Sequence, residues 1–310
     1  MQLWPHQQNA LRVCREHHAA GSSRVLVQLP PGTGKTEVGV LAALEWVKGG
    51  PFRRALIAVT TGPILQQYYR RLVALTALPV AIEKATRTDL HQSRIVVASQ
   101  ATLWSRLEKY HSQTLCIIDE CHHANYDAPE NLRLLRRFDH VVGLSATPWS
   151  SGCRQLFDHS AHSFLSLRQA QEACLVAPFA VREWESVHGP WALVFCSTNK
   201  ECAERSAKHP RSSWIGVNVA AAQVAERIRA WRGRRLDVLY VNRMLLEGFD
   251  ESRCSSVWIA KDSDSDIMIV QMVGRALRYL PGKSAHIYCT SPDMLKRVQA
   301  ALERLNHPTF

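Results

Sequence analysis

The sequence predicts an α/β protein with two tandem domains, each a mostly parallel sheet with helices on both faces. Its 310 residues are enough for two compact domains. Short apolar runs alternate with amphipathic runs, as expected when strands alternate with helices. This alternation stops between about residues 149 and 190 and then starts again. We therefore expect domains at residues 1–160 and 161–310, joined within residues 149–190.

The first domain is predicted to contain five strands and two long helices. The expected strands are residues 24–29, 55–60, 95–98, 115–119 and 141–145, and the expected helices are residues 36–47 and 64–75. Because helices intervene between the strands, neighbouring strands are expected to run parallel with helices on both faces of the sheet.

The second domain is predicted to repeat the same plan. The expected strands are residues 191–196, 236–241, 257–260 and 285–289, and the expected helices are residues 200–208, 219–231, 267–279 and 292–305. No low-complexity tract or short repeat interrupts either half.

The composition favours a globular protein that binds a polyanion. The formal net charge is +11, of which residues 1–150 contribute +6 and residues 151–310 contribute +5. Nucleic acid is the natural partner of such a surface, although an ordinary basic protein is the alternative. No apolar run approaches the ~18 residues of a membrane span, and no secretory signal is recognised. Nine scattered cysteines favour free thiols in a reducing, cytoplasmic compartment.

Residues 29–36, Leu-Pro-Pro-Gly-Thr-Gly-Lys-Thr, follow a predicted strand and open a predicted helix. Such a loop points its backbone N–H groups at phosphate oxygens, and the helix N-terminus adds its positive dipole end. The expected contacts are Gly32, Thr33, Gly34, Lys35 and Thr36. Lys35 would contact the β- and γ-phosphates and Thr36 would bind Mg²⁺. The general pattern begins with glycine where this chain has Leu29, and a plain glycine-rich turn is the alternative.

Two carboxylates end the apolar strand expected at residues 115–119. In phosphate-loop ATPases an aspartate at the position of Asp119 holds Mg²⁺, and an adjacent glutamate such as Glu120 orients or deprotonates the attacking water. Ligands bind at the carboxyl edge of a parallel sheet, so both residues are expected close to the phosphate loop. Alone, the pair would more often be a polar strand end.

The tetrapeptide Asp119-Glu120-Cys121-His122, together with the phosphate loop, resembles the superfamily 2 helicases and translocases. The likeness to DNA-repair and restriction-type members is the strongest. Further family motifs follow in order at residues 145–147, 192–197, 246–250 and 271–278. The resemblance implies two RecA-like domains with a minimal motor core. It also implies that Ser145 and Thr147 couple nucleotide state to strand contact, and that Gly248 and Asp250 contribute to the nucleotide site.

The sixth family motif, Gln-x-x-Gly-Arg-x-x-Arg, matches residues 271–278. Gln271, Arg275 and Arg278 are spaced to share one face of the helix expected at residues 267–279. The resemblance implies that these arginines complete the ATP site from the second domain, where paired guanidinium groups suit a triphosphate. A solvated basic helix face is the alternative.

Residues 3–7, Leu-Trp-Pro-His-Gln, resemble the family's glutamine motif, in which the amide of Gln7 would contact adenine. Related proteins often have arginine where this chain has Trp4, and a helix-entry segment with an incidental glutamine is the alternative.

The resemblance also implies contacts to the phosphates of one nucleic-acid strand, which give affinity without sequence choice. The matching positions are Thr60, Thr61, Gly62, Gln66, Ser99, Gln100 and Thr102 in the first domain, and Ser197, Thr198, Asn242 and Arg243 in the second. Tyr68, Tyr69 and Trp104 could stack on bases, although each is more often a core residue at such a spacing.

The first hypothesis is therefore a monomeric, ATP- and Mg²⁺-dependent helicase or translocase that acts on DNA more readily than on RNA. An ATP-gated clamp or annealing factor without net unwinding is the alternative, and strand displacement would distinguish the two. A phosphate-loop kinase or metabolic ATPase would leave residues 145–147 and 271–278 unexplained. A protein partner is conceivable, but no residue identifies one.

Overall fold

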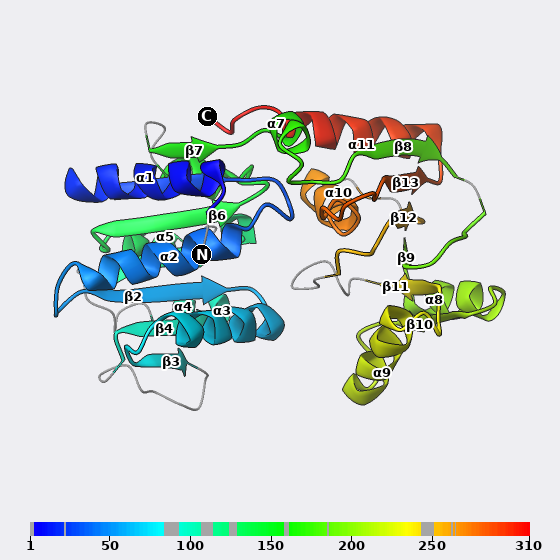
Figure 1. The fold of residues 1–310 in the computed structure, drawn as a ribbon, viewed down its shortest axis with the longest axis horizontal. Coiled ribbons are helices and arrows are strands. Elements are labelled where there is room, and N and C mark those ends of the chain that lie inside the picture. The colour runs from blue at the N-terminus through cyan, green and yellow to red at the C-terminus, as the bar shows by residue number, and fades with distance from the viewer. Residues whose placement is uncertain are drawn as a thin grey trace. The chain divides into compact units, whose positions relative to one another are not determined.

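The computed structural model describes residues 3–21, 23–83, 93–106, 114–123, 129–157, 161–184, 186–242, 251–261, 263 and 265–310. The chain divides into two compact units (Figure 1). The first comprises Met1–Pro30, Gly34–Ser166 and Pro308–Phe310, and the second comprises Pro31–Thr33 and Leu167–His307. Each unit contains one parallel sheet with helices, so the predicted α/β fold class is confirmed.

The first unit is built on a seven-stranded sheet in the order β3-β4-β2-β5-β6-β1-β7. Its strands are β1 (Ser23–Gln28), β2 (Arg54–Val59), β3 (Val80–Glu83), β4 (Ile95–Ser99), β5 (Thr114–Asp119), β6 (His140–Ser145) and β7 (His162–Phe164). Every pair is parallel. The central strands are almost continuously apolar, which is typical of strands that are covered on both faces.

Helices cover both faces of this sheet. They are α1 (Pro5–Ala19), α2 (Lys35–Lys48), α3 (Gly62–Leu75), α4 (Gln100–Arg106), α5 (Pro129–Leu135) and α6 (Ser151–Leu156). Alternate side chains of β2 point to opposite faces of the sheet: Ile57 packs with α1–α3, and Leu56 packs with α4–α6. A short 3₁₀ turn, Cys121–His123, joins the second layer.

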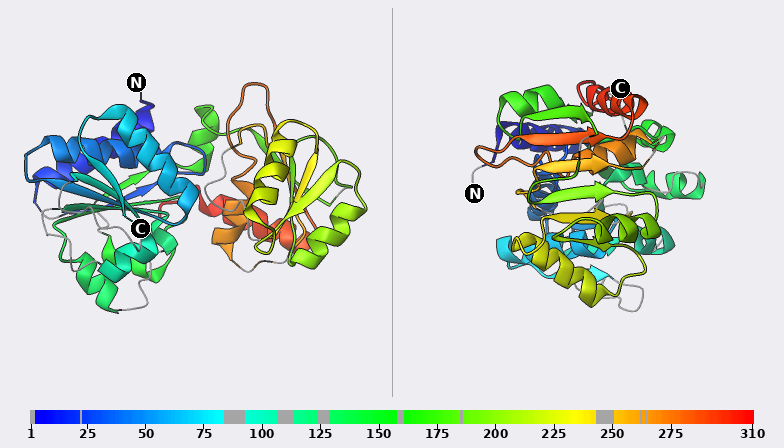
Figure 2. Two further views of the ribbon diagram at one scale, coloured as in Figure 1. Left: turned by 90° about the horizontal axis from the view of Figure 1, so that it is seen from below. Right: turned by 90° about the vertical axis from the view of Figure 1, so that its right-hand side faces the viewer.

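The second unit contains a six-stranded parallel sheet in the order β10-β11-β9-β12-β13-β8 (Figure 2). Its strands are β8 (Phe179–Glu183), β9 (Ala192–Phe195), β10 (Ser212–Ile215), β11 (Val238–Val241), β12 (Ser256–Ile259) and β13 (Ala285–Cys289). Its helices are α7 (Leu167–Glu172), α8 (Asn199–Ala207), α9 (Ala221–Arg232), α10 (Asp266–Val273) and α11 (Pro292–Arg304).

The helix expected at residues 267–279 is shorter than predicted. Helix α10 ends at Val273, and two short-range bonds, from Arg275 N to Met272 O and from Ala276 N to Val273 O, form a tight turn. The backbone then pairs with the segment before β8, where Val176 bridges Arg278 in antiparallel fashion. This tertiary pairing overrides the helical pattern. The prediction that Gln271, Arg275 and Arg278 share one helix face was therefore wrong.

The sequence pattern also missed several elements. Residues 149–190 contain edge strands of both sheets, since β7 pairs with β1 and β8 pairs with β13. The three-residue β7 carries too little periodicity to be recognised. Helix α1 was missed as well, although Pro5 at its first turn and buried Ala10, Leu11 and Cys14 at helical spacing are a recognisable signal. No described helix is long and apolar enough to cross a membrane.

Candidate functional site

The predicted ATP-site residues of the first unit converge at the carboxyl edge of its sheet. The phosphate loop follows β1, Asp119 ends β5 and Ser145 ends β6. Strands β5, β6 and β1 are consecutive neighbours in the sheet. Since all three are parallel, their carboxyl ends meet at one edge. The topology therefore gathers motifs that are more than a hundred residues apart in the sequence.

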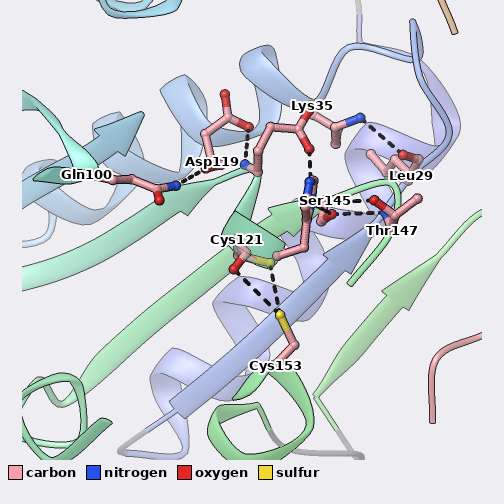
Figure 3. A network of polar contacts seen from close by, with 10 residues as sticks. Leu29, Lys35, Gln100, Asp119, Cys121, Ser145, Thr147 and Cys153 are labelled. Atoms are coloured by element: carbon pink, nitrogen blue, oxygen red, sulfur yellow. Dashed lines mark hydrogen bonds and ion pairs between the residues drawn. The ribbon is translucent and has the colours of Figure 1, made fainter. Parts of the chain in front are cut away.

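The phosphate loop has the backbone conformation that glycine supplies. Gly32 and Gly34 both adopt φ of +84°, a left-handed region that other residues seldom enter. Helix α2 begins immediately afterwards, at Lys35. The Lys35 Nζ donates to the carbonyl of Leu29 at 3.3 Å, so its ammonium group is folded back over the loop (Figure 3). A loop of this shape at a helix N-terminus fits a phosphate group.

Asp119 is a buried carboxylate at the end of β5, with 5% of its surface exposed. Burial and the neighbouring Glu120 raise the pKa of Asp119 to about 7, and Lys35 opposes this rise. Its Oδ1 accepts a 3.0 Å bond from Glu120 N. A divalent cation would favour the ionised form of such a carboxylate. The donor set of Asp119 and the Thr36 hydroxyl thus fits a magnesium ion with bound phosphates.

Glu120 has a left-handed backbone with φ of +47°. Such a conformation in a residue other than glycine costs about 1–3 kcal/mol and is concentrated at functional sites. The carboxylate stays accessible, with 22% of the side chain exposed. Behind the pair, Gln100 Nε2 donates to the carbonyl of Asp119 at 2.8 Å and ties the start of α4 to the end of β5 (Figure 3).

A buried hydrogen-bond network links the acidic pair to the end of β6 (Figure 3). His122 Nδ1 lies 2.7 Å from Ser145 Oγ and 3.5 Å from Glu120 Oε2. Ser145 Oγ also accepts a 2.9 Å bond from Thr147 N, and the Thr147 hydroxyl lies 3.4 Å from His122 Nδ1. The network connects Glu120 through His122 to Ser145 and Thr147, the two residues expected to couple nucleotide state to strand contact.

Gln7 connects helix α1 to the phosphate loop. Its Oε1 accepts a 3.1 Å bond from Trp4 N, and its Nε2 donates to the carbonyl of Gly34 at 3.4 Å. The side chain is 5% exposed. Its predicted contact with adenine stays a prediction.

The nucleic-acid contacts predicted for the first unit follow β2 and β4 at the same carboxyl edge. The hydroxyls of Thr60 and Thr61 are buried and have no hydrogen-bond partner in the structure. Ser99 and Thr102 bond to each other at 2.9 Å. Gly62 is exposed and Gln66 is half-buried, while Gln100 is 7% exposed. Gln100 therefore supports Asp119 from within the core.

The predicted contacts of the second unit follow β9 and β11. Ser197 and Thr198 are exposed, and the Thr198 hydroxyl caps helix α8 by accepting a 3.0 Å bond from Glu201 N. Asn242 Nδ2 donates to Asn199 Oδ1 at 3.2 Å. Arg243, Gly248 and Asp250 lie outside the described residues.

The three residues of the sixth motif lie in the second unit around the end of α10. Gln271 is in the last turn of the helix, and its carbonyl accepts a 3.2 Å bond from Arg275 Nε. Burial lowers the pKa of Arg278 to about 10, far above neutral, so its guanidinium stays charged. Their convergence on a nucleotide held by the first unit stays a prediction.

Sequence reasoning gave His122 no role of its own, although the Asp-Glu-Cys-His tetrapeptide was the signal that marked it. It also left Tyr68 open as a base-stacking residue. Tyr68 has no exposed surface and packs in the core with α1–α3, so it cannot stack on a base. Trp104 packs against the opposite core layer, and Tyr69 is half-buried.

Comparisons with known proteins show what this chain is similar to. Residues 1–150 match the family described as "Type III restriction enzyme, res subunit". The chain is 27% identical over 171 residues to the ATP-dependent DNA helicase MPH1 of Candida albicans, covering 49% of this chain and 14% of that protein. It is 31% identical over 137 residues to the ATP-dependent DNA helicase RecG of a Synechocystis species, covering 40% of this chain and 16% of that protein.

Among solved structures, the chain is similar to the ATP-dependent Type ISP restriction-modification enzyme LlaBIII bound to DNA. The TM-score is 0.74 at 15% identity, and the match covers 99% of this chain and 30% of that enzyme. At this identity the likeness shows the fold alone. The chain spans less than a third of each of these three proteins.

Proposed function

We propose that this chain, which carries a superfamily 2 helicase core, is an ATP-dependent helicase or translocase that acts on DNA. The observation that supports the proposal most strongly is the network at the carboxyl edge of the first sheet. There Lys35, Asp119 and Glu120 form a phosphate and cation site, and His122 connects that site to Ser145 and Thr147.

In the proposed reaction, the backbone N–H groups of the phosphate loop bind the ATP phosphates. Lys35 leaves the Leu29 carbonyl and neutralises the β- and γ-phosphates. A bound magnesium ion, held by Thr36 and Asp119, would add positive charge at the same phosphates. Glu120 orients the attacking water and accepts its proton, for which its partly exposed carboxylate and left-handed backbone are suited.

Gln271, Arg275 and Arg278 are proposed to complete this site from the second unit. The guanidinium groups of Arg275 and Arg278 would stabilise charge on the transferred phosphoryl group, an effect worth about 10³–10⁵ in rate where it has been measured in other ATPases and GTPases. ATP would then hold the two units together and hydrolysis would release them. Gly248 and Asp250 are proposed to contribute to the same nucleotide site.

The substrate is proposed to be DNA, gripped through its phosphates. The relatives are named as DNA helicases and the LlaBIII structure is described as bound to DNA. Thr60 and Thr61, whose hydroxyls have no partner in the structure, follow β2 where a strand would pass. The other proposed contacts are Gly62, Gln66, Ser99, Thr102, Ser197, Thr198, Asn242 and Arg243, whereas the buried Gln100 is assigned to the support of Asp119. The relatives do not favour the clamp alternative.

The test is the rate of ATP hydrolysis with single-stranded DNA, duplex DNA, forked DNA, and single-stranded and duplex RNA. We expect DNA to stimulate hydrolysis more than RNA, and Lys35→Ala and Glu120→Gln to abolish the stimulation. Lys48→Ala, at the far end of the same helix, is the matched control and should retain full activity. Hydrolysis that is indifferent to nucleic acid would favour a metabolic ATPase instead. Wild-type turnover in Glu120→Gln would refute the assigned role of that residue.

A further inference from the structure

The amino edge of the second sheet carries a cluster of five arginines that the proposed motor site does not use. Trp191 precedes β9, Arg211 precedes β10 and Arg253 precedes β12. Arg232 ends helix α9, and Arg234 and Arg235 lie in the turn between α9 and β11. Because the six strands are parallel, this edge is opposite the carboxyl edge that carries Ser197, Thr198 and Asn242. The four-residue strands put about 13 Å between the two edges.

Ion pairs, hydrogen bonds and cation–π contacts join these residues into one cluster, to which Arg235 adds its charge beside Arg234. Glu251 pairs with Arg232 at 3.2 Å and with Arg253 at 2.7 Å. The guanidinium groups of Arg253 and Arg234 lie 5.3 and 5.2 Å from the ring centroid of Trp191. Arg211 donates to the carbonyl of Arg234 and pairs with Asp237 at 2.9 Å. The cluster is continuous across four segments of the chain.

The arginine cluster has more positive than negative charge. Among the described residues, the carboxylates of Asp237 and Glu251 pair with these arginines, so the described cluster has three positive charges in excess. Arg234 and Arg235 are exposed and make no ion pair with any described residue. The side chains of Arg211, Arg232 and Arg253 are 56%, 44% and 41% exposed although they are paired. The excess charge therefore faces solvent.

The backbone of the cluster is unusual. Trp191, Arg211 and Arg234 have φ of +56°, +54° and +59°, and they are three of the five residues other than glycine with positive φ in the described chain. Left-handed backbone at such residues is seldom kept without a reason, and it is concentrated at binding and catalytic sites. Trp191 and Arg211 stand directly before β9 and β10, and Arg234 lies in the turn that leads to β11.

We propose that the arginine cluster is a second nucleic-acid site, which binds the phosphate backbone of the DNA on which the motor acts. Two features of the arginine cluster suit it to a chain of phosphates. All five cations are arginines, whose planar forks bind phosphate oxygens in pairs. Two of them are held against Trp191, so they lose little freedom on binding.

The site is not a base-stacking platform, because two guanidinium groups lie over the Trp191 ring. It contacts phosphates without sequence preference. The inference rests on the proposed function in that nucleic acid is its ligand, but it concerns a different edge of the sheet from the motor contacts.

The test compares Arg234→Gln/Arg235→Gln with the matched control Arg168→Gln/Lys296→Gln. The control removes two exposed charges from the same unit outside the arginine cluster. Binding of a fluorescent duplex of about 20 base pairs, and of the corresponding single strand, is measured by anisotropy between about 50 and 200 mM salt. Each lost phosphate contact lowers the slope of log affinity against log salt by about 0.9 for duplex and about 0.7 for single-stranded DNA.

We expect the cluster variant to lower the slope by about 1.8 for duplex, or about 1.4 if the ligand is a single strand, and the control to leave it unchanged. Arg234→Lys/Arg235→Lys should restore the slope. A cluster variant that matches the control in both salt series would overturn the proposal. Binding to poly-glutamate that depends on the cluster, with unchanged DNA binding, would also overturn it and indicate an acidic protein partner.

The rate of ATP hydrolysis at saturating DNA separates this site from the proposed function. It should be unchanged in the cluster variant. Should hydrolysis prove indifferent to DNA in the wild type while the cluster variant still changes the salt slope, the motor proposal would fail and the phosphate site would stand.

Discussion

Replacement of Ser145 by alanine should separate ATP hydrolysis from movement. Ser145 is completely buried, and its hydroxyl accepts from Thr147 N at 2.9 Å and bonds His122 Nδ1 at 2.7 Å. After Ser145→Ala, His122 keeps weaker contacts with the Thr147 hydroxyl at 3.4 Å and with Glu120 at 3.5 Å. Thr147 N loses its acceptor, and leaving one buried donor unsatisfied costs about 1–3 kcal/mol.

This loss should weaken the coupling of hydrolysis to movement, because Ser145→Ala breaks the network that joins His122 to Thr147. Hydrolysis itself should be spared, because Lys35, Asp119 and Glu120 are unchanged. A coupling loss of about 1–3 kcal/mol corresponds to a fall of about 5- to 160-fold in strand displacement. ATP hydrolysis should change by only about threefold, well below 1 kcal/mol. Both rates are measured on one preparation of the variant.

The control for this experiment is Ser163→Ala, which removes another buried serine hydroxyl of the same unit. Ser163 lies on β7 and accepts from Asn9 Nδ2 at 3.3 Å, away from the acidic pair. It should lose a comparable amount of stability while the ratio of displacement to hydrolysis stays at the wild-type value. If Ser145→Ala lowers both rates by the same factor, or lowers neither, the network does not carry coupling.

Three further predictions test the site and its support. Gly34→Ala should weaken ATP binding at least tenfold, because left-handed φ costs about 1–2 kcal/mol at alanine and its Cβ would clash with Gln7 Nε2. Titration with a fluorescent ATP analogue checks this, and Gly50→Ala, which meets only a side-chain carbon at 3.9 Å, should bind normally. Gln100→Leu leaves the Asp119 carbonyl without its 2.8 Å donor and should lower the free energy of unfolding by about 1–3 kcal/mol in a urea titration, whereas an unchanged midpoint would contradict the support role. Burial lowers the pKa of His18 to about 4, so the unfolded chain binds more protons than the folded chain between about pH 6.5 and 4. The free energy of unfolding should therefore fall by up to about 3 kcal/mol as the pH falls through this window. His18→Phe should reduce that loss, and an equal pH dependence of stability in both proteins would refute the prediction.

Much of the fold could be predicted because strands that are buried on both faces appear as short apolar runs between glycine-rich turns. The phosphate loop and Asp119-Glu120 were located because each follows such a run. The short edge strands β7 and β8 gave no comparable signal, since three to five half-buried residues carry little periodicity. Helix α10 was overextended because the bridge between Val176 and Arg278 is a tertiary contact that local patterns do not contain.

The candidate site was predicted in part for the same reason. The apolar runs showed where strands end, and Lys35 and Asp119 come shortly after or at such ends. Both residues were therefore assigned correctly to one edge of the sheet. It could not show that Gln100 is buried against the Asp119 carbonyl, because side-chain direction at the start of a helix depends on packing. The arginine cluster around Trp191 was missed because its members are spread over residues 191–253 and meet only through the parallel order of the strands.

The central claim is that hydrolysis of ATP in this core moves the protein along DNA. The most direct measurement is displacement of a third strand from a DNA triplex by the wild-type chain, with ATP, with a non-hydrolysable analogue and without nucleotide. We predict that the wild-type chain displaces the third strand only when ATP is present, and that the Glu120→Gln variant displaces no strand under any of the three conditions. Equal displacement with the non-hydrolysable analogue, or none with ATP despite DNA-stimulated hydrolysis, would contradict movement and indicate a clamp.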